Sequence, residues 1–322
     1  MTKALEDKIE NVKATKQVYI FDSKIYAYNA LHKNTAVTQI FEDMMRDLVR
    51  LKKRGKIYIA YDVGHSDYRE GQQAYYKGHR RVAIAKQSQE EQDAHKQFNV
   101  DYIKLIDLFK TLDVTVVAVN GVEADDLMSL VALKHPEDKV TILTADFDTL
   151  HSVVGTDNVR LYSGRNYKFF DHQYVVDNYG VSTRRAFTLL KAISSDKGDN
   201  LLAFRNMGPV KSQIVYDSLP DDPTDEDAIN AIEVYIEANP RIKVHEEHVN
   251  EGRTTVESAF RSNMLVAATF TDTDKMTDIQ RKEYAECFLY TRTSETFEEA
   301  SIRLFGFPIM LSLQAKRVFN AK

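Results

Sequence analysis

The stretch Val140-Thr141-Ile142-Leu143-Thr144-Ala145-Asp146-Phe147-Asp148 joins an apolar, strand-like run to two carboxylates. The same arrangement follows the apolar runs 18–21, 57–61 and 116–119, where the acidic residues are Asp22, Asp62, Glu123, Asp125 and Asp126. In an open parallel α/β sheet, the carboxyl ends of the strands converge on one crevice where ligands bind. Carboxylates gathered there repel one another unless cations neutralise them, so the pattern predicts a site for more than one metal ion.

Strand-like and helix-like periodicities alternate over the first two-thirds of the chain. We expect strands at 18–22, 57–61, 114–119, 140–144 and 159–162, with helices at about 36–53 and 92–112 and a further helix opening at Asp125. This alternation predicts a mostly parallel, doubly wound α/β sheet. Later helices are expected at 184–193, 226–238, 255–270, 278–290 and 310–320.

Composition excludes several classes of protein. The single Cys287 rules out an internal disulfide and a cysteine-rich zinc site. Residues 1–16 are charged and lack an apolar run, and no stretch is long enough to span a membrane, so we expect a cytoplasmic protein with no membrane partner. The net charge of −5 argues against a nucleic-acid partner when taken alone.

Nine carboxylates make up the predicted metal site: Asp22, Asp62, Glu123, Asp125, Asp126, Asp146, Asp148, Asp196 and Asp199. All are hard oxygen ligands without Cys or His at ligand spacing, which selects Mg²⁺ or Mn²⁺ over zinc. The set exceeds what one such ion needs, so two ions are expected, and neutralising the set would leave the chain basic. Each Asp, taken singly, could instead be a loop or helix-capping residue. Four strand ends that share the pattern favour the metal site.

Residues 63–90 lack apolar periodicity and are long for a connection, so we expect a mobile loop that is disordered without nucleic acid. Its candidate nucleic-acid-binding residues are Arg69, Tyr76, Lys77, Arg80 and Arg81. Cations would neutralise a phosphate, and an aromatic ring would stack on an unpaired base. The alternative is an exposed basic loop whose tyrosines pack locally.

Residues 184–216 predict a helix, a loop and a second helix that begins near Pro209. A glycine turn before a helix exposes backbone N–H groups that can hold a phosphate, and Lys211 adds charge. The candidate contacts are therefore Gly208, Lys211 and Ser212. An ordinary helical hairpin remains the alternative.

The ordered acidic set, with the groups 123–126, 144–148 and 196–200, resembles the flap endonuclease / 5′-nuclease superfamily, and its phage ribonuclease H members most of all. The likeness covers about residues 16–216. It implies a first metal site of Asp22, Asp62, Glu123 and Asp125, a second of Asp146, Asp148, Asp196 and Asp199, and Asp126 near both. It also implies that Lys77 and Arg80 contact the scissile phosphate, with Tyr76 as their aromatic neighbour.

In that family, the segment matching 186–216 is a helix-three-turn-helix that grips duplex DNA and often holds K⁺. The family often carries Gly-x-x-Gly-x-Gly there, whereas 202–208 keeps only Gly208. The resemblance implies an α/β nuclease domain at 1–183 with its arch at 63–90, the DNA-binding segment at 184–216, and a helical C-terminal region at 217–322.

The implied activity is that of a 5′-to-3′ exonuclease and flap endonuclease that uses two Mg²⁺ ions, with Mn²⁺ as a substitute, and leaves 5′ phosphates. Lys77, Arg80, Asp125 and Asp146 are expected to carry the catalysis. The implied substrates are forked, flap or nicked DNA and RNA–DNA hybrids, including RNA primers in phage replication. A monomer that meets a single-strand-binding protein and a sliding clamp is expected.

Two other functions fit parts of the sequence. Residues 146–150 after a strand resemble the nucleophile motif of aspartyl-phosphate phosphatases, and Gly198-Asp199 resembles their metal motif. That chemistry leaves Asp22, Asp62 and Glu123 without a role. A non-catalytic DNA-structure-binding protein is the other alternative, and it would require missing metal ligands.

Overall fold

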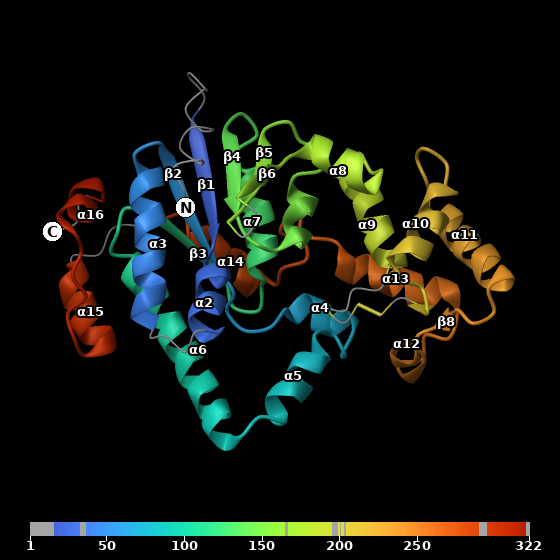
Figure 1. The fold of residues 1–322 in the computed structure, drawn as a ribbon, viewed down its shortest axis with the longest axis horizontal. Coiled ribbons are helices and arrows are strands. Elements are labelled where there is room, and N and C mark those ends of the chain that lie inside the picture. The colour runs from blue at the N-terminus through green and yellow to red at the C-terminus, as the bar shows by residue number, and fades with distance from the viewer. Residues whose placement is uncertain are drawn as a thin grey trace. The chain divides into compact units, whose positions relative to one another are not determined.

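The computed structural model describes residues 16–32, 37–164, 167–194, 199, 201–202, 204–289 and 295–319. The chain divides into two compact units, the first formed by Met1–Ser66, Ser88–His172 and Phe270–Lys322, the second by Asp67–Gln87 and Gln173–Thr269 (Figure 1). These units differ from the predicted division at 183 and 216. The C-terminal region is shared between them, and most of the arch belongs to the second unit.

A six-stranded sheet forms the centre of the first unit, in the order β3-β2-β1-β4-β5-β6. Its strands are β1 (Gln17–Asp22), β2 (Gly55–Tyr61), β3 (Thr115–Ala118), β4 (Lys139–Leu143), β5 (Val159–Ser163) and β6 (Lys168–Phe170). Every neighbouring pair is parallel except β5 and β6, which are antiparallel. The predicted mostly parallel α/β sheet is confirmed, and β6 is an addition that the sequence pattern did not indicate.

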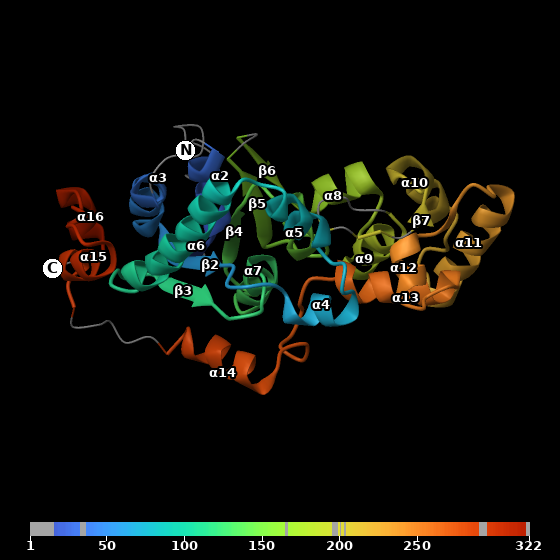
Figure 2. The ribbon, with the colours of Figure 1, turned by 90° about the horizontal axis from the view of Figure 1, so that it is seen from below.

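Helices cover both faces of this sheet. On one face, α3 (Val37–Lys52) and α6 (Gln89–Phe109) pack on alternate strand residues such as Tyr19, Phe21 and Ile59. On the other face, α7 (Ala124–Leu133) packs on β1, β2 and β3 (Figure 2). The remaining helices of the unit are α2 (Ser23–His32), the 3₁₀ helix η1 (Phe147–Ser152), α14 (Asp278–Glu286), α15 (Phe297–Phe305) and α16 (Leu313–Val318).

The last two helices complete the core of the first unit, although they lie far from it in sequence. Phe297 of α15 packs against Phe41 of α3 in a tilted arrangement, with ring centroids 5.1 Å apart. Phe319, just after α16, is fully buried in the same cluster. Burying such aromatic rings stabilises the folded unit by roughly 2–3 kcal/mol each. The α/β unit therefore needs its C-terminal segment.

The second unit is mostly helical. Its elements are α4 (Asp67–Gln72), α5 (Gly78–Ala85), α8 (His172–Tyr179, whose first residue belongs to the first unit), α9 (Arg184–Ile193), α10 (Pro209–Asp217), α11 (Asp225–Ala238), α12 (Glu246–Asn250), α13 (Val256–Ala267) and the antiparallel ribbon of β7 (Phe204–Arg205) and β8 (Lys243–Val244). The arch thus contains two short helices, α4 and α5. Its mobility stays a prediction.

Two features of α9 explain why its predicted range, 184–193, matches the structure. The Thr183 hydroxyl accepts a hydrogen bond from the Ala186 amide and caps the helix. The apolar residues recur at helical spacing and are buried, including Leu189 and Ile193. In the described part of the chain, no helix is long and apolar enough to cross a membrane.

Candidate metal and nucleic-acid site

Seven of the nine predicted carboxylates lie at the carboxyl ends of the strands in the first unit. We call this set the acidic edge; its members are Asp22, Asp62, Glu123, Asp125, Asp126, Asp146 and Asp148. The parallel register aligns the strand ends, since Asp22 of β1 is the partner of Ala60 in β2, and Phe21 is the partner of Leu143 in β4. Asp196 falls outside the described residues, and Asp199 belongs to the second unit.

Asp22, the last residue of β1, is buried, with 6% of its surface exposed. Burial, and secondly the negative charge of Asp62, raise the pKa of Asp22 to about 6. Its Oδ1 accepts a hydrogen bond from the Lys24 amide at 2.9 Å. A buried carboxylate whose neighbour repels it is one whose charge a cation would stabilise.

Asp62 follows β2 and has two partners. Its Oδ1 accepts a 2.6 Å hydrogen bond from the backbone amide of Ala124, the first residue of α7. Its Oδ2 forms an ion pair with the Lys24 ammonium group. A carboxylate at a helix N-terminus also interacts favourably with the helix dipole. Asp62 is therefore held in place by the backbone of α7 and by the Lys24 side chain.

Thr144 connects two members of the acidic edge. Its hydroxyl donates to Asp22 Oδ2 at 2.7 Å and accepts from the Asp146 amide at 3.0 Å. Asp146 in turn caps η1, because its Oδ1 accepts from the Asp148 amide at 2.9 Å. One buried hydroxyl thus orients the ends of β1 and β4 relative to each other.

The acidic residues of α7 have separate surroundings. Asp126 is fully buried and accepts a 2.9 Å hydrogen bond from the Phe270 amide. Asp125 is half-buried and accepts a 3.4 Å hydrogen bond from the Thr149 hydroxyl of η1. Glu123 is the N-cap residue of α7, with extended backbone and no capping hydrogen bond from its side chain. The buried Asp126 carboxylate therefore already accepts a hydrogen bond from the backbone after α13.

The donor chemistry of the acidic edge fits hard divalent cations, since every side-chain donor is a carboxylate oxygen. The raised pKa of buried Asp22, beside Asp62, is the observation that supports the fit. Among the described residues, however, no three acidic, histidine or cysteine side chains are arranged to hold a metal ion. Several of their oxygens instead accept hydrogen bonds from backbone amides, and Lys24 neutralises Asp62.

Asp199 brings together two predicted cations of the second unit. Lys77 Nζ and Arg80 Nη2 each lie 3.4 Å from Asp199 Oδ1. The Lys77 amide also donates to the Asp199 carbonyl at 3.0 Å. Lys77 adopts a left-handed backbone conformation, with φ 50°, immediately before α5. The turn and its ion pairs fix Lys77 and Arg80 beside one carboxylate.

Two other predicted arch residues are buried, and a third forms a surface ion pair. The Arg69 side chain is buried, and its guanidinium donates to the Val266 and Ala268 carbonyls at 3.0 and 3.1 Å, at the C-terminal end of α13. Tyr76 is buried in the core of the second unit. Arg81 pairs with Glu70 at 2.7 Å. For Arg69 and Tyr76, the structure gives a role different from the predicted contact with nucleic acid.

Of the predicted contacts around α10, Lys211 lies on the surface, whereas Ser212 is buried. Gly208 is the N-cap of α10, followed by Pro209 at its first position. Lys211 Nζ donates to the Asn206 carbonyl at 2.9 Å on the surface. Ser212 is fully buried, and its hydroxyl donates to the Gly208 carbonyl at 3.0 Å. Ser212 therefore stabilises the start of the helix.

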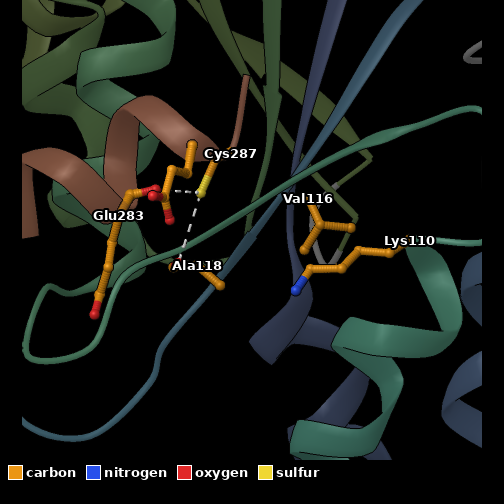
Figure 3. Close-up of a pocket in the computed structure, with 6 residues that line it drawn as sticks. Lys110, Val116, Ala118, Glu283 and Cys287 are labelled. Carbon is orange, nitrogen blue, oxygen red and sulfur yellow. Dashed lines mark hydrogen bonds between the residues drawn. The ribbon is translucent and has the colours of Figure 1, made fainter. Parts of the chain in front are cut away.

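A cavity of about 330 Å³ lies at the β3 edge of the sheet in the first unit (Figure 3). It is lined by Lys110, Val116, Ala118, Glu283, Glu286 and Cys287. The Cys287 thiol donates to the Glu283 carbonyl at 3.3 Å, and burial raises its pKa. None of the predicted site residues lines this cavity.

Sequence reasoning missed the parts played by Lys24 and Thr144. The sequence feature that could have indicated the role of Lys24 is its position two residues after Asp22, just beyond the end of a strand. Thr144 lies within the quoted stretch that ends at Asp148. Because hydroxyls and lysines are common at strand ends, only the three-dimensional contacts distinguish these two residues.

Comparison with known proteins places the chain in a described family. Residues 12–180, more than half of the chain, match the family model for the 5′-3′ exonuclease, N-terminal resolvase-like domain. The flap endonuclease of Escherichia phage T5 is 25% identical over 213 residues, which cover 64% of this chain and 71% of that protein. DNA polymerase I of Mycobacterium leprae is 30% identical over 173 residues, covering 52% of this chain and 18% of the polymerase.

Solved structures share the fold. The phage T5 5′-exonuclease with bound divalent zinc ions superposes with a TM-score of 0.66 at 21% identity, covering 85% of this chain and 99% of that one. The phage T5 flap endonuclease in a complex with DNA and metal ions gives a TM-score of 0.64 at 20% identity, with the same coverage. These likenesses confirm the resolvase-like α/β architecture.

Proposed function

Because this chain belongs to the 5′-3′ exonuclease family, a family of nucleases, we propose that it is a metal-dependent 5′-to-3′ exonuclease and flap endonuclease. The observation that carries the proposal is the acidic edge, where carboxylates from three strand ends and the first turn of α7 meet in one unit. The family match favours this chemistry over the aspartyl-phosphate phosphatase.

We propose that the acidic edge, together with Asp196 and Asp199, holds two Mg²⁺ ions, for which Mn²⁺ can substitute. When bound, such ions activate the attacking water and stabilise the leaving 3′ oxygen. The chain's own part is to orient the ligands. Thr144 fixes Asp22, and the Ala124 amide fixes Asp62. The Lys24 ammonium group forms an ion pair with the Asp62 carboxylate.

Lys77 and Arg80 are proposed to bind the scissile phosphate. Lys77 Nζ and Arg80 Nη2 each lie 3.4 Å from Asp199 Oδ1, so this carboxylate holds the two cations close to each other. Opposite charge on the phosphate would draw them from the carboxylate, and in that position they would stabilise the charge that develops during cleavage. Because the leaving group is the 3′ oxygen, the products would carry 5′ phosphates.

The proposed substrates are forked, flap or nicked DNA and RNA–DNA hybrids, with RNA primers of phage replication among them. The relative in phage T5 is named a flap endonuclease, and one of its solved complexes contains DNA and metal ions. A single-strand-binding protein, a sliding clamp and a K⁺ ion near α9 and α10 remain proposals drawn from the resemblance. Gly208 and Lys211 are proposed to contact the duplex backbone.

The test is cleavage of a 5′-end-labelled flap substrate with Mg²⁺ and with EDTA. We expect Asp146→Asn to lower the cleavage rate on the order of 10³-fold, because a bound metal ion supplies several kcal/mol of transition-state stabilisation. Asparagine keeps the cap on η1, so the variant should fold and bind the flap substrate. The matched control is Asp157→Asn, an exposed carboxylate just before β5. Equal activity in the presence of EDTA would refute the metal-dependent mechanism.

A further inference from the structure

Asn263 of α13 is fully buried and joins three segments of the second unit. Its Nδ2 donates to the Ala192 carbonyl of α9 at 3.1 Å. Its Oδ1 accepts a hydrogen bond from Nε2 of Gln73, just after α4, at 2.9 Å and lies 3.1 Å from Nε2 of His248 in α12. A carbonyl oxygen only accepts, so His248 Nε2 carries the proton and donates. One side-chain amide thus links α9, α12 and the segment that follows α4.

The segment 73–76, which we call the arch base, is anchored by this amide. Gln73 is fully buried and bonds to Asn263 directly. Tyr75 is connected through His248, because the Tyr75 hydroxyl donates to His248 Nδ1 at 3.0 Å. The ring of Tyr76 is buried in the core of the second unit. The arch base therefore cannot shift without breaking buried hydrogen bonds or opening a cavity in the core.

The two segments that Asn263 joins lead to the two sides of one ion-paired turn. Lys77 follows Gln73 by four residues, and Asp199 follows Ala192 by seven. Where they meet, the Lys77 amide donates to the Asp199 carbonyl at 3.0 Å, and Lys77 Nζ lies 3.4 Å from Asp199 Oδ1. Lys77 has φ 50°, and a lysine keeps such a left-handed conformation only where its surroundings hold it there. The Asn263 amide supplies part of that hold on both sides of the turn.

We infer that Asn263 is a positioning residue for Lys77 and Arg80, the two cations that Asp199 holds together. The inference rests on the proposed nuclease function, in which these cations bind the scissile phosphate. Asn263 is fully buried, so it acts through the arch base and contacts no substrate. Because the two cations stabilise charge that develops during cleavage, displacing them should lower kcat, whereas KM depends on all of the substrate's phosphates and should change little.

The test compares flap cleavage by Asn263→Ala with that by the wild type, in Mg²⁺ and at a temperature where unfolding scans show both proteins to be folded. We expect kcat to fall roughly 10–100-fold, as displacements of about 1 Å at a reacting centre do, with KM within about twofold of the wild type. Asn239→Ala is the matched control. The Asn239 side chain donates to the Tyr235 carbonyl of α11 at 2.9 Å, so this variant should lose stability but keep the wild-type kcat.

A double-mutant cycle separates positioning from a general loss of structure. When Lys77→Met/Arg80→Met has already removed both cations, adding Asn263→Ala should change kcat by less than about twofold, since it acts through those cations. Losses that multiply in the combined variant, or a wild-type kcat in Asn263→Ala, would overturn the inference while cleavage by the wild type leaves the nuclease function standing. Absence of cleavage by the wild type would refute the nuclease function, and the inference with it.

Gln73→Met tests the same connection with a smaller disturbance, should Asn263→Ala not fold. It removes the hydrogen bonds from the arch base to Ser262 and Asn263 but keeps the shape of the side chain and the bond from Asn263 to Ala192. We expect kcat to fall roughly tenfold with KM retained, and no further loss where both cations are already absent. A wild-type kcat in Gln73→Met would likewise overturn the inference.

Discussion

Thr144 Oγ1 lies 2.7 Å from Asp22 Oδ2, and this hydrogen bond couples the ends of β4 and β1. The same oxygen accepts the Asp146 amide at 3.0 Å. Thr144 is fully buried, so water does not replace either bond when the side chain is changed. The orientation of two proposed metal ligands therefore depends on one hydroxyl.

Thr144→Val should lower flap cleavage and apparent Mg²⁺ affinity by roughly 10–100-fold, the usual effect of removing a hydrogen bond that orients a metal ligand. Valine has nearly the same shape, so the fold should persist. Mg²⁺ titrations of the cleavage rate make the measurement. Thr141→Val, within β4, is the control because the Thr141 hydroxyl accepts a hydrogen bond from the Arg160 guanidinium, whereas the Thr144 hydroxyl donates to a carboxylate. An unchanged Mg²⁺ requirement in Thr144→Val would contradict the prediction.

Lys24→Met should destabilise the metal-free protein by roughly 1 kcal/mol, because it removes the cation that pairs with Asp62. Added Mg²⁺ should restore the stability, since a bound ion would neutralise the same carboxylate. Thermal unfolding in EDTA and in Mg²⁺ measures both effects. Lys96→Met, at a surface pair in α6, should respond to neither. A loss at Lys24 that Mg²⁺ fails to recover would argue against a metal ion at Asp62.

His248 predicts a pH dependence of stability. Burial lowers its pKa from 6.5 to about 4 in the folded protein, and Tyr75 and Asn263 hydrogen-bond its two ring nitrogens. Above pH 6.5 the ring is neutral in both states, and its contribution is complete. As pH falls from 6.5 towards 4, the unfolded chain takes up the proton first, and stability falls by about 3 kcal/mol in all.

Urea unfolding at pH 7.5 and pH 5 should therefore show a larger loss of stability for the wild type than for His248→Gln, which has no ring to protonate. His79→Gln, an exposed histidine of the same unit, serves as the control and should behave as the wild type does. Parallel losses in the wild type and His248→Gln would show that other groups govern the acid response.

Arg69→Lys should destabilise the protein by roughly 2–3 kcal/mol. The guanidinium donates to two carbonyls at the end of α13, and the lysine ammonium cannot reproduce that fork. Arg81→Lys keeps a surface ion pair with Glu70 and should cost less than about 1 kcal/mol. Urea midpoints of both variants provide the comparison. Similar midpoints for the two variants would show that the buried contacts of Arg69 contribute little.

The sequence predicted the sheet and its acidic edge because both depend on local patterns. Apolar runs of four or five residues followed by carboxylates are visible without a structure, as at Asp22 and Asp146. The strand ends then meet because the sheet is parallel. The antiparallel β6 was missed because its three residues, 168–170, are too few to show a period.

The arch could not be predicted, because distant residues stabilise it. Gln73, just after α4, is fully buried and donates to Ser262 and Asn263 of α13 at 3.0 and 2.9 Å. Arg69 depends on carbonyls almost 200 residues away in sequence. A polar segment whose partners lie so far along the chain looks like an exposed loop in a local window. Their burial is what gave Arg69 and Tyr76 unexpected roles.

Asp126 accepts its hydrogen bond from Phe270, 144 residues later, where the chain re-enters the first unit. This re-entry sets an order on biosynthesis. A nascent chain that has emerged only as far as residue 269 holds every member of the acidic edge but lacks α15 and α16, which complete the core. The nuclease unit should therefore reach its final packing only after α15 and α16 have left the ribosome. Translation of the acidic edge thus precedes, by more than 100 residues, the translation of the helices that complete the core around it.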